Sequence, residues 1–174
     1  MEKKACGILM IIAPEKFRDE ELNHPRDVFK SQGAEVTVVS TKTGTAIGSY
    51  GHRETIGKTL DDVAGATFDA VVVVGGSGSP QHLWDNKKIH DIVRRHHKLG
   101  KVVSAICLSG AVLAKAGLLD GVEATVWKSD ESMKVYAEHK VKFVDKPVVR
   151  SGKIITANGP AAAREFGQTI MSAV

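Results

Sequence analysis

Short apolar runs alternate along this chain with segments of helical periodicity. The runs are rich in β-branched residues and cover residues 5–12, 35–40, 69–74 and 101–106, with shorter ones at 141–143, 148–150 and 153–156. Helical patterns fill residues 19–32, 87–99, 108–116, 130–138 and 160–173. Apolar runs without polar alternation are typical of strands buried on both faces, and helices between such strands are the crossovers of a parallel sheet. The pattern therefore predicts a three-layer α/β/α sandwich.

Glycines mark the ends of two predicted helices. Gly33 closes the helix over 19–32, and Gly117 stops the helix over 108–116, as C-terminal caps commonly do. Residues 41–57 are rich in Gly, Thr and Ser and predict a loop that contains a short hairpin. Its two arms are expected at 45–48 and 53–56, on either side of Gly51.

The length and the composition fit one ordinary domain. A chain of 174 residues with 43% apolar residues can bury a substantial core, so we expect a single domain over residues 1–174. There are two cysteines, no secretory signal pattern and no long uncharged apolar segment. These features favour a cytoplasmic protein with no membrane partner.

The formal charge of +4 raises the question of a nucleic-acid partner. The basic residues are scattered among acidic ones, and two Trp and two Tyr supply little surface for base stacking. We therefore expect a solvated surface and no nucleic acid. His96 and His97 are adjacent on a predicted helix and project to different sides of it, so no metal site is expected there.

Cys107 stands where a β-branched run gives way to an Ala- and Leu-rich helical pattern. That junction predicts a strand, a sharp turn and a helix, the arrangement of a nucleophile elbow. A thiol at such a turn points toward solvent, and the free N–H groups of the helix start favour its thiolate. Cys107 is therefore a candidate nucleophile; the alternative is a buried cysteine that acts as a small apolar side chain. Cys6 lies within a strand pattern, so we favour core packing for it.

A glycine-rich segment follows the preceding predicted strand and reaches the same edge of the sheet. In such sheets, ligands bind beyond the carboxyl ends of the strands. The backbone N–H groups of Gly76 and Leu108 could hold the oxyanion that forms when Cys107 attacks a carbonyl carbon, with Gly75 and Ser77 beside them in the pocket. The alternative is a tight strand-to-helix turn, because the segment lacks the signature of a phosphate-binding loop.

Four segments, in the same order along the chain, resemble the ThiJ/PfpI superfamily. They are residues 17–25, the Val-Val-Val-Gly-Gly run at 72–76, the Ala-Ile-Cys run at 105–107, and residues 156–160 with the Glu-Phe pair at 165–166. The resemblance covers almost the whole chain. It implies a flavodoxin-like, mostly parallel sheet of the class I glutamine amidotransferase type, a cysteine nucleophile, no cofactor, and a homodimer or larger homo-oligomer.

The resemblance also implies a role for Glu21. In that family a glutamate four residues before a proline hydrogen-bonds the nucleophilic cysteine, and Glu21 before Pro25 matches this position. A carboxyl beside a thiolate must hold a proton to donate, so it can serve as a general acid and base. The alternative is that Glu20 and Glu21 are helix-start carboxylates favoured by the helix dipole. Asp19 is predicted to be the N-cap, and Arg26 a contact for an anion or a carboxylate in the pocket.

Two positions depart from the family pattern. Leu108 stands where the protease branch has a histidine after the cysteine, and Trp127 stands in the segment where the human-like branch has one. His52 and His139 are the candidates to replace that imidazole, although both are expected at the surface. Trp127 could instead wall the pocket, or pack in the core.

Three functions remain open on this evidence. The first is a cysteine-dependent hydrolase or lyase that acts on small reactive carbonyl or acyl compounds, as the resemblance implies for glyoxalase and deglycase members. The second is an intracellular peptidase whose site is completed by oligomerisation. The third is a stress-response redox sensor in which Cys107 oxidises to sulfenic or sulfinic acid. The substrate is accordingly a small molecule or a peptide.

Overall fold

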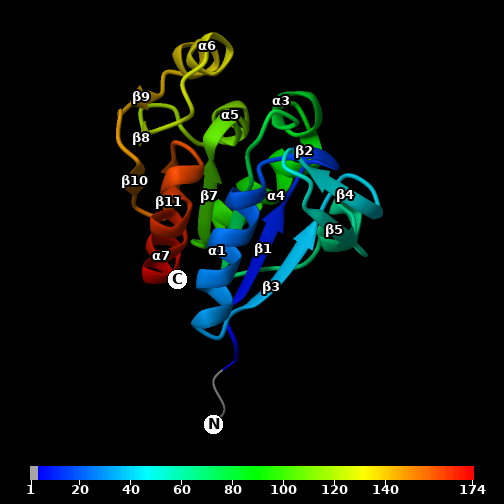
Figure 1. Ribbon diagram of the computed structural model, residues 1–174. Helices are drawn as coiled ribbons and strands as arrows, with labels where there is room; N and C mark the ends of the chain where they lie inside the picture. Colours follow the sequence, from blue (N-terminus) through cyan, green and yellow to red (C-terminus); the bar gives the residue numbers. More distant parts are fainter. Residues whose placement is uncertain (1–3) are drawn as a thin grey trace.

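A six-stranded sheet forms the centre of the computed structural model, which describes residues 4–174 (Figure 1). In spatial order its strands are β10 (Val148–Ser151), β11 (Ile154–Ala157), β7 (Val102–Ile106), β6 (Ala70–Val73), β1 (Gly7–Ile11) and β3 (Glu35–Val39). All neighbouring strands are parallel except β10 and β11, which are antiparallel. The predicted mostly parallel sheet is therefore confirmed.

Helices cover both faces of the sheet. One face carries α1 (Asp19–Ser31) and α7 (Ala163–Ala173), which lie side by side in Figure 1. The other face carries α2 (Leu60–Val63), α4 (Lys87–Lys98) and α5 (Gly110–Lys115), and each layer has its own apolar core. The three-layer sandwich expected from the sequence is thus confirmed.

The side chains of β6 show why its run is apolar throughout. Val71 and Val73 pack into the core under α4 and α5, whereas Ala70 and Val72 pack into the core under α1 and α7. All four are fully buried. A fully buried valine contributes roughly 1.5–3 kcal/mol, so a strand covered on both faces is stabilised at every position.

The smaller elements surround the upper edge of the sheet. The predicted hairpin is present as β4 (Gly44–Gly48) and β5 (Arg53–Ile56), and β2 (Glu15–Phe17) pairs with β4 in parallel. The remaining elements are α3 (Ser79–His82), β8 (Glu123–Ala124), α6 (Asp130–Glu138), β9 (Lys142–Phe143) and two 3-10 turns, η1 (Cys107–Ser109) and η2 (Pro160–Ala162). The sequence did not predict β2, β8, α2 and α3, because segments of two to four residues show no period.

The glycine caps and the helix termini follow the expected chemistry. Gly33 and Gly117 have φ values of 80° and 84°, which suit glycine just beyond a helix end. The helices predicted at 108–116 and 160–173 each begin with a 3-10 turn. Over residues 4–174, every helix is too short or too polar to span a bilayer.

Two of the histidines of α4, His90 and His96, are hydrogen-bonded to the backbone. His96 is buried, and its Nε2 accepts a hydrogen bond from Phe68 N at 3.0 Å while its Nδ1 lies 2.8 Å from Ile92 O. Burial lowers the pKa of His96, which keeps the ring neutral. His90 Nε2 lies 2.8 Å from Trp84 O. These imidazoles therefore serve packing, and the described part of the chain contains no cluster of three or more metal-ligating side chains.

Candidate active site

Three segments converge at the carboxyl edge of the sheet. They are the start of α1, the loop after β6, and the η1 turn after β7. Arg18 N donates to Gly75 O at 3.0 Å, and Gly78 N donates to Lys16 O at 3.0 Å. These bonds join the first two segments, so residues far apart in the sequence are held around Cys107.

The turn at Cys107 is strained and well supported. Its φ of 61° is in the left-handed region, which costs a non-glycine residue on the order of 1 kcal/mol or more. Trp127 N donates to the carbonyl of Cys107 at 3.2 Å, and Trp84 Nε1 donates to the carbonyl of Leu108 at 2.9 Å. Ser109 Oγ donates to Val74 O at 2.6 Å. The surrounding structure therefore holds the predicted elbow in place.

The Cys107 side chain is largely buried but lines a cavity. The residue is 7% exposed, and the cavity has a volume of about 370 Å³. The other lining residues come from six segments of the chain: Arg18, Ser49, Tyr50, Gly76, Ser77, Leu108, Trp127 and Pro160. A small molecule can therefore reach the sulfur, whereas the sequence predicted a thiol that points out toward solvent.

Glu21 projects from the first turn of α1 to the underside of Cys107. It is fully buried, and the groups that face its carboxyl are the thiol of Cys107 and the backbone N–H of Gly75. Neither carboxyl oxygen makes a hydrogen bond of ordinary geometry within residues 4–174. Burial raises the pKa of Glu21 to about 8, and the opposing effects of Cys107, Arg18 and the Gly75 backbone do not offset it. Glu21 is therefore a neutral carboxylic acid at pH 7, able to donate to the sulfur.

The electrostatics of the thiol differ from the sequence-based expectation. Burial raises the pKa of Cys107, and a negative charge on Glu21 raises it further. The N–H groups of Leu108 and Gly76 act in the opposite direction but do not offset burial. The expectation that the helix start alone would favour the thiolate is therefore wrong. Since a buried thiol and carboxyl cannot both ionise readily, a thiolate here is accompanied by a proton on Glu21.

The structure brings most of the predicted site residues together. Gly76, Ser77, Leu108 and Trp127 line the cavity with Cys107. Gly75 lies beneath it: a Cβ at that position would sit 2.6 Å from Cys107 Cβ and 2.6 Å from Glu21 Oε1. Trp127 is 49% exposed, so the interpretation as a wall of the pocket fits and core packing does not.

Arg26 and the candidate histidines lie elsewhere. Arg26 Nη1 donates to Glu54 Oε2 at 2.8 Å, and this ion pair joins α1 to β5 away from the cavity lining. Arg26 thus contacts a carboxylate but is not a pocket residue. His52 Nε2 lies 2.9 Å from Glu54 Oε1, and His139 ends α6. Among the residues described, no imidazole lines the cavity of Cys107.

Sequence reasoning missed four residues of the cavity, namely Arg18, Ser49, Tyr50 and Pro160. Arg18 directly precedes the acidic start of α1, and its position three residues before Glu21 was the available signal. Tyr50 sits in the hairpin loop, and only tertiary packing brings that loop to the elbow. The Arg18 guanidinium carbon lies 4.6 Å from the centre of the Tyr50 ring, which fixes both side chains at the rim.

Asp19 holds the hairpin loop in position. The N-cap of α1 is Arg18, so the prediction that Asp19 caps the helix is wrong. Asp19 is instead the first helical residue, and its carboxylate accepts hydrogen bonds from Tyr50 N at 3.1 Å and from His52 N at 2.9 Å. The close approach requires Gly48, because a Cβ there would lie 2.1 Å from Asp19 Oδ1.

Replacing Asp19 with asparagine should destabilise this connection. In the native protein each carboxylate oxygen of Asp19 accepts from one backbone N–H. In the variant the side-chain amide nitrogen, which is itself a donor, would replace one of these acceptors. One buried hydrogen bond would therefore be lost. We expect the free energy of unfolding to fall by about 2 kcal/mol in denaturant titrations. Asp27→Asn, at an exposed position of the same helix, is the matched control. Equal stability of the two variants would contradict this role of Asp19.

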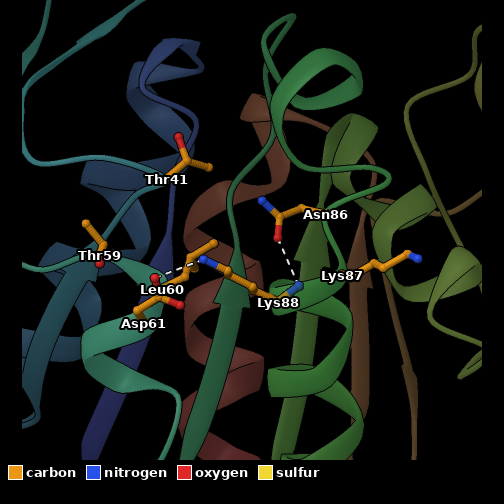
Figure 2. A pocket seen from close by; sticks show the side chains of 7 residues that line it. All are labelled: Thr41, Thr59, Leu60, Asp61, Asn86, Lys87 and Lys88. Atoms are coloured by element: carbon orange, nitrogen blue, oxygen red, sulfur yellow. Dashed lines mark hydrogen bonds and ion pairs between the residues drawn. The ribbon is translucent and has the colours of Figure 1, made fainter.

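Other cavities of the described structure are not lined by Cys107, among them one beside α4 and one beside Trp127. Figure 2 shows one of about 330 Å³ beside the start of α4, where Asn86 caps the helix and Lys88 Nζ pairs with Asp61 Oδ2 at 2.9 Å. None of the predicted site residues lines it. The other, of about 550 Å³, shares Trp127 and Pro160 with the Cys107 cavity. Of these cavities, the candidate nucleophile Cys107 therefore lines only the one of about 370 Å³, and Glu21 lies buried next to its thiol.

Comparison with known proteins gives a consistent result. The sequence profile described as the DJ-1/PfpI family matches residues 7–173. An uncharacterised protein of Methanocaldococcus jannaschii is 44% identical over 98% of this chain and 83% of its own length. A protein of Pyrococcus horikoshii named as a deglycase is 31% identical over 88% of this chain and 90% of its own length. The crystal structure of a ThiJ/PfpI domain protein from Brachyspira murdochii superimposes with a TM-score of 0.92 at 30% identity, covering 98% of this chain and 97% of that one.

Proposed function

Because the chain belongs to the DJ-1/PfpI family, we propose that it is a cysteine-dependent enzyme acting on small reactive carbonyl or acyl compounds, as glyoxalases and deglycases do. One observation carries the proposal: the Cys107 thiol lines a cavity while the buried, proton-bearing carboxyl of Glu21 faces it. The deglycase name of an aligned relative supports the same class of substrate.

The chemistry follows from the arrangement of the Cys107 thiol and the Glu21 carboxyl. With one proton removed from the pair, the thiolate adds to an aldehyde carbon and forms a C–S bond, while the π electrons of the carbonyl move to its oxygen. The N–H groups of Gly76 and Leu108 stabilise that oxyanion. Glu21 then gives its proton to the oxygen, which yields a hemithioacetal and leaves Glu21 as a carboxylate base. No cofactor takes part in these steps.

The peptidase alternative is less well supported by the cavity. Expelling an amine requires a group that protonates nitrogen, and the lining residues described above include no imidazole. A base from another subunit would be needed. A homodimer or larger homo-oligomer in the cytoplasm is nevertheless part of our proposal, with family membership in support and sedimentation as its measurement.

The redox-sensor alternative has one observation in its favour. The Glu21 carboxyl carries a proton and has no other strong partner, so it could donate to an oxygen added to Cys107. Intact-mass analysis after graded peroxide tests this role. Preferential gain of oxygen at Cys107 supports it, and equal oxidation of Cys6 contradicts it.

The enzymatic proposal predicts a large loss of activity without the thiol. Lactate formation from methylglyoxal should fall by roughly a thousandfold or more in Cys107→Ser, since removal of a nucleophile removes the covalent step. Glu21→Gln should lower the rate by roughly a hundredfold. Cys6→Ser, at a partly buried cysteine of the strand layer, is the control and should keep full activity. Turnover by Cys107→Ser at the rate of the unaltered protein would sink the proposal.

A further inference from the structure

We infer that the cavity above Cys107 selects carbonyl compounds that carry a carboxylate, and that Arg18 binds this carboxylate. The inference rests on the proposed function of Cys107 and names the class of substrate. Its smallest representative is glyoxylate, in which the aldehyde carbon is bonded directly to the carboxylate. The supporting observations are the charge of the cavity, the fixed position of the guanidinium and the size of the space.

The charged lining of the cavity is cationic. Its ionisable lining residues are Arg18, Tyr50 and Cys107, and within residues 4–174 no carboxylate side chain lines it. Glu20 pairs with Arg18 but does not line the cavity. Glu21 faces the sulfur and is neutral at pH 7 because burial raises its pKa to about 8. A carboxylate that enters this space therefore meets a cation and no anionic side chain.

The guanidinium of Arg18 is oriented before any ligand arrives. Its Nε donates to Glu20 Oε2 at 2.7 Å, and its plane is held by the Tyr50 ring, whose centre lies 4.6 Å away. Its two terminal nitrogens make no hydrogen bond to any residue in the described range. An arginine with two available parallel N–H groups is suited to bind a carboxylate through both oxygens. Because the side chain is already ordered, little further conformational entropy is lost on binding.

The remaining lining groups favour a small polar ligand. Ser49, Ser77 and Tyr50 supply hydroxyl groups, and Trp127 and Pro160 supply an apolar wall. A cavity of about 370 Å³ is near the lower end of the range for ligand sites, so it suits a compound of few atoms. A neutral dicarbonyl would fit the same space, but it has no carboxylate for the two terminal nitrogens of Arg18 to bind.

The covalent step for glyoxylate is balanced within the site. With one proton removed from the Cys107–Glu21 pair, the C=O π bond of the aldehyde and the O–H bond of Glu21 break. A C–S bond forms from the thiolate and an O–H bond forms on the former carbonyl oxygen, which leaves Glu21 as a carboxylate. The product is a hemithioacetal, and its carboxylate remains on Arg18. Adduct formation requires no oxidant or reductant.

Adduct formation with glyoxylate and with glyoxal provides the test, because the two compounds differ chiefly in one carboxylate. Carbon-13 NMR of the labelled aldehydes gives a dissociation constant for each hemithioacetal, and Cys107→Ser serves to assign the signal. We expect the preference for glyoxylate over glyoxal to fall roughly tenfold or more in Arg18→Gln, as befits a lost charge-assisted hydrogen bond. Added salt should weaken the binding of glyoxylate more than the binding of glyoxal, because it screens the charge on Arg18.

A matched control and two contrary outcomes complete the experiment. Arg53→Gln, at an exposed position on β5, should keep the preference of the unaltered protein. An unchanged preference in Arg18→Gln, or no preference in the unaltered protein, overturns the inference alone. The absence of both adducts, together with no turnover of methylglyoxal, overturns the proposed function and the inference with it.

Discussion

The free energy of unfolding of the unaltered protein should fall as the pH rises from 5 to 8, and Glu21→Gln should abolish this fall. The ordinary pKa of a glutamate is 4.5, and burial raises the pKa of Glu21 in the folded protein to about 8. Between these values the folded protein holds a proton that the unfolded chain has released. The free energy of unfolding therefore decreases as the pH rises through this window. The full effect is on the order of 4 kcal/mol, because each tenfold change in proton concentration costs about 1.4 kcal/mol.

Glutamine keeps the shape of the protonated carboxyl and does not titrate. Denaturant titrations of both proteins at pH 5, 6, 7 and 8, with reductant present, give the free energy of unfolding at each pH. The variant should become steadily more stable than the unaltered protein as the pH rises. The window ends at pH 8 because unfolded cysteine begins to ionise above it, and burial raises the pKa of folded Cys107 as well.

The neighbouring residue supplies the control. Hydrogen bonding to Arg18 lowers the pKa of Glu20, so its stabilising contribution is lost only in more acidic solution. Glu20→Gln should therefore leave the pH dependence between 5 and 8 unchanged. Parallel curves for Glu21→Gln and the unaltered protein would mean that Glu21 is ionised when folded, and the general-acid role would fail with them.

The sheet could be predicted because its signal is local. The run at 69–74 is apolar at every position, and a strand covered by helices on both faces requires this. The hairpin of β4 and β5 was also predictable, since two short apolar or β-branched runs lie on either side of Gly51. Elements such as β2 and α3 were not, because their few residues are fixed by contacts with distant segments.

The residues of the candidate site likewise divide into those that could be predicted from the sequence and those that could not. Cys107 and Gly76 follow strands directly, so the order of the strands alone brings them to one edge. The positions of Tyr50 and Arg18 depend on Asp19, which binds the hairpin loop through two backbone N–H groups. No periodic pattern encodes that contact. The state of the thiol was mispredicted for a related reason, because burial by distant residues outweighed the effect of the local helix start.

Gly75→Ala should disrupt both the fold and the site, because glycine is required by packing at this position. A Cβ there would lie 2.5 Å from Ile106 O, 2.6 Å from Cys107 Cβ and 2.6 Å from Glu21 Oε1. Such distances force the strand edge or the two functional side chains to move. We expect the free energy of unfolding to fall by roughly 3 kcal/mol, the upper end for one added methyl group in a packed core.

The same substitution tests whether Glu21 and Cys107 share one confined space. Gly65→Ala is the matched control, since a Cβ there would meet nothing within 4 Å, and its stability should stay within about 0.5 kcal/mol of the unaltered protein. In a Glu21→Ala background one of the three close contacts is absent, so Gly75→Ala should cost less there than in the unaltered chain. Equal costs in both backgrounds would show that the added methyl group does not press on the carboxyl. The close packing of acid and thiol around Gly75 would then need another explanation.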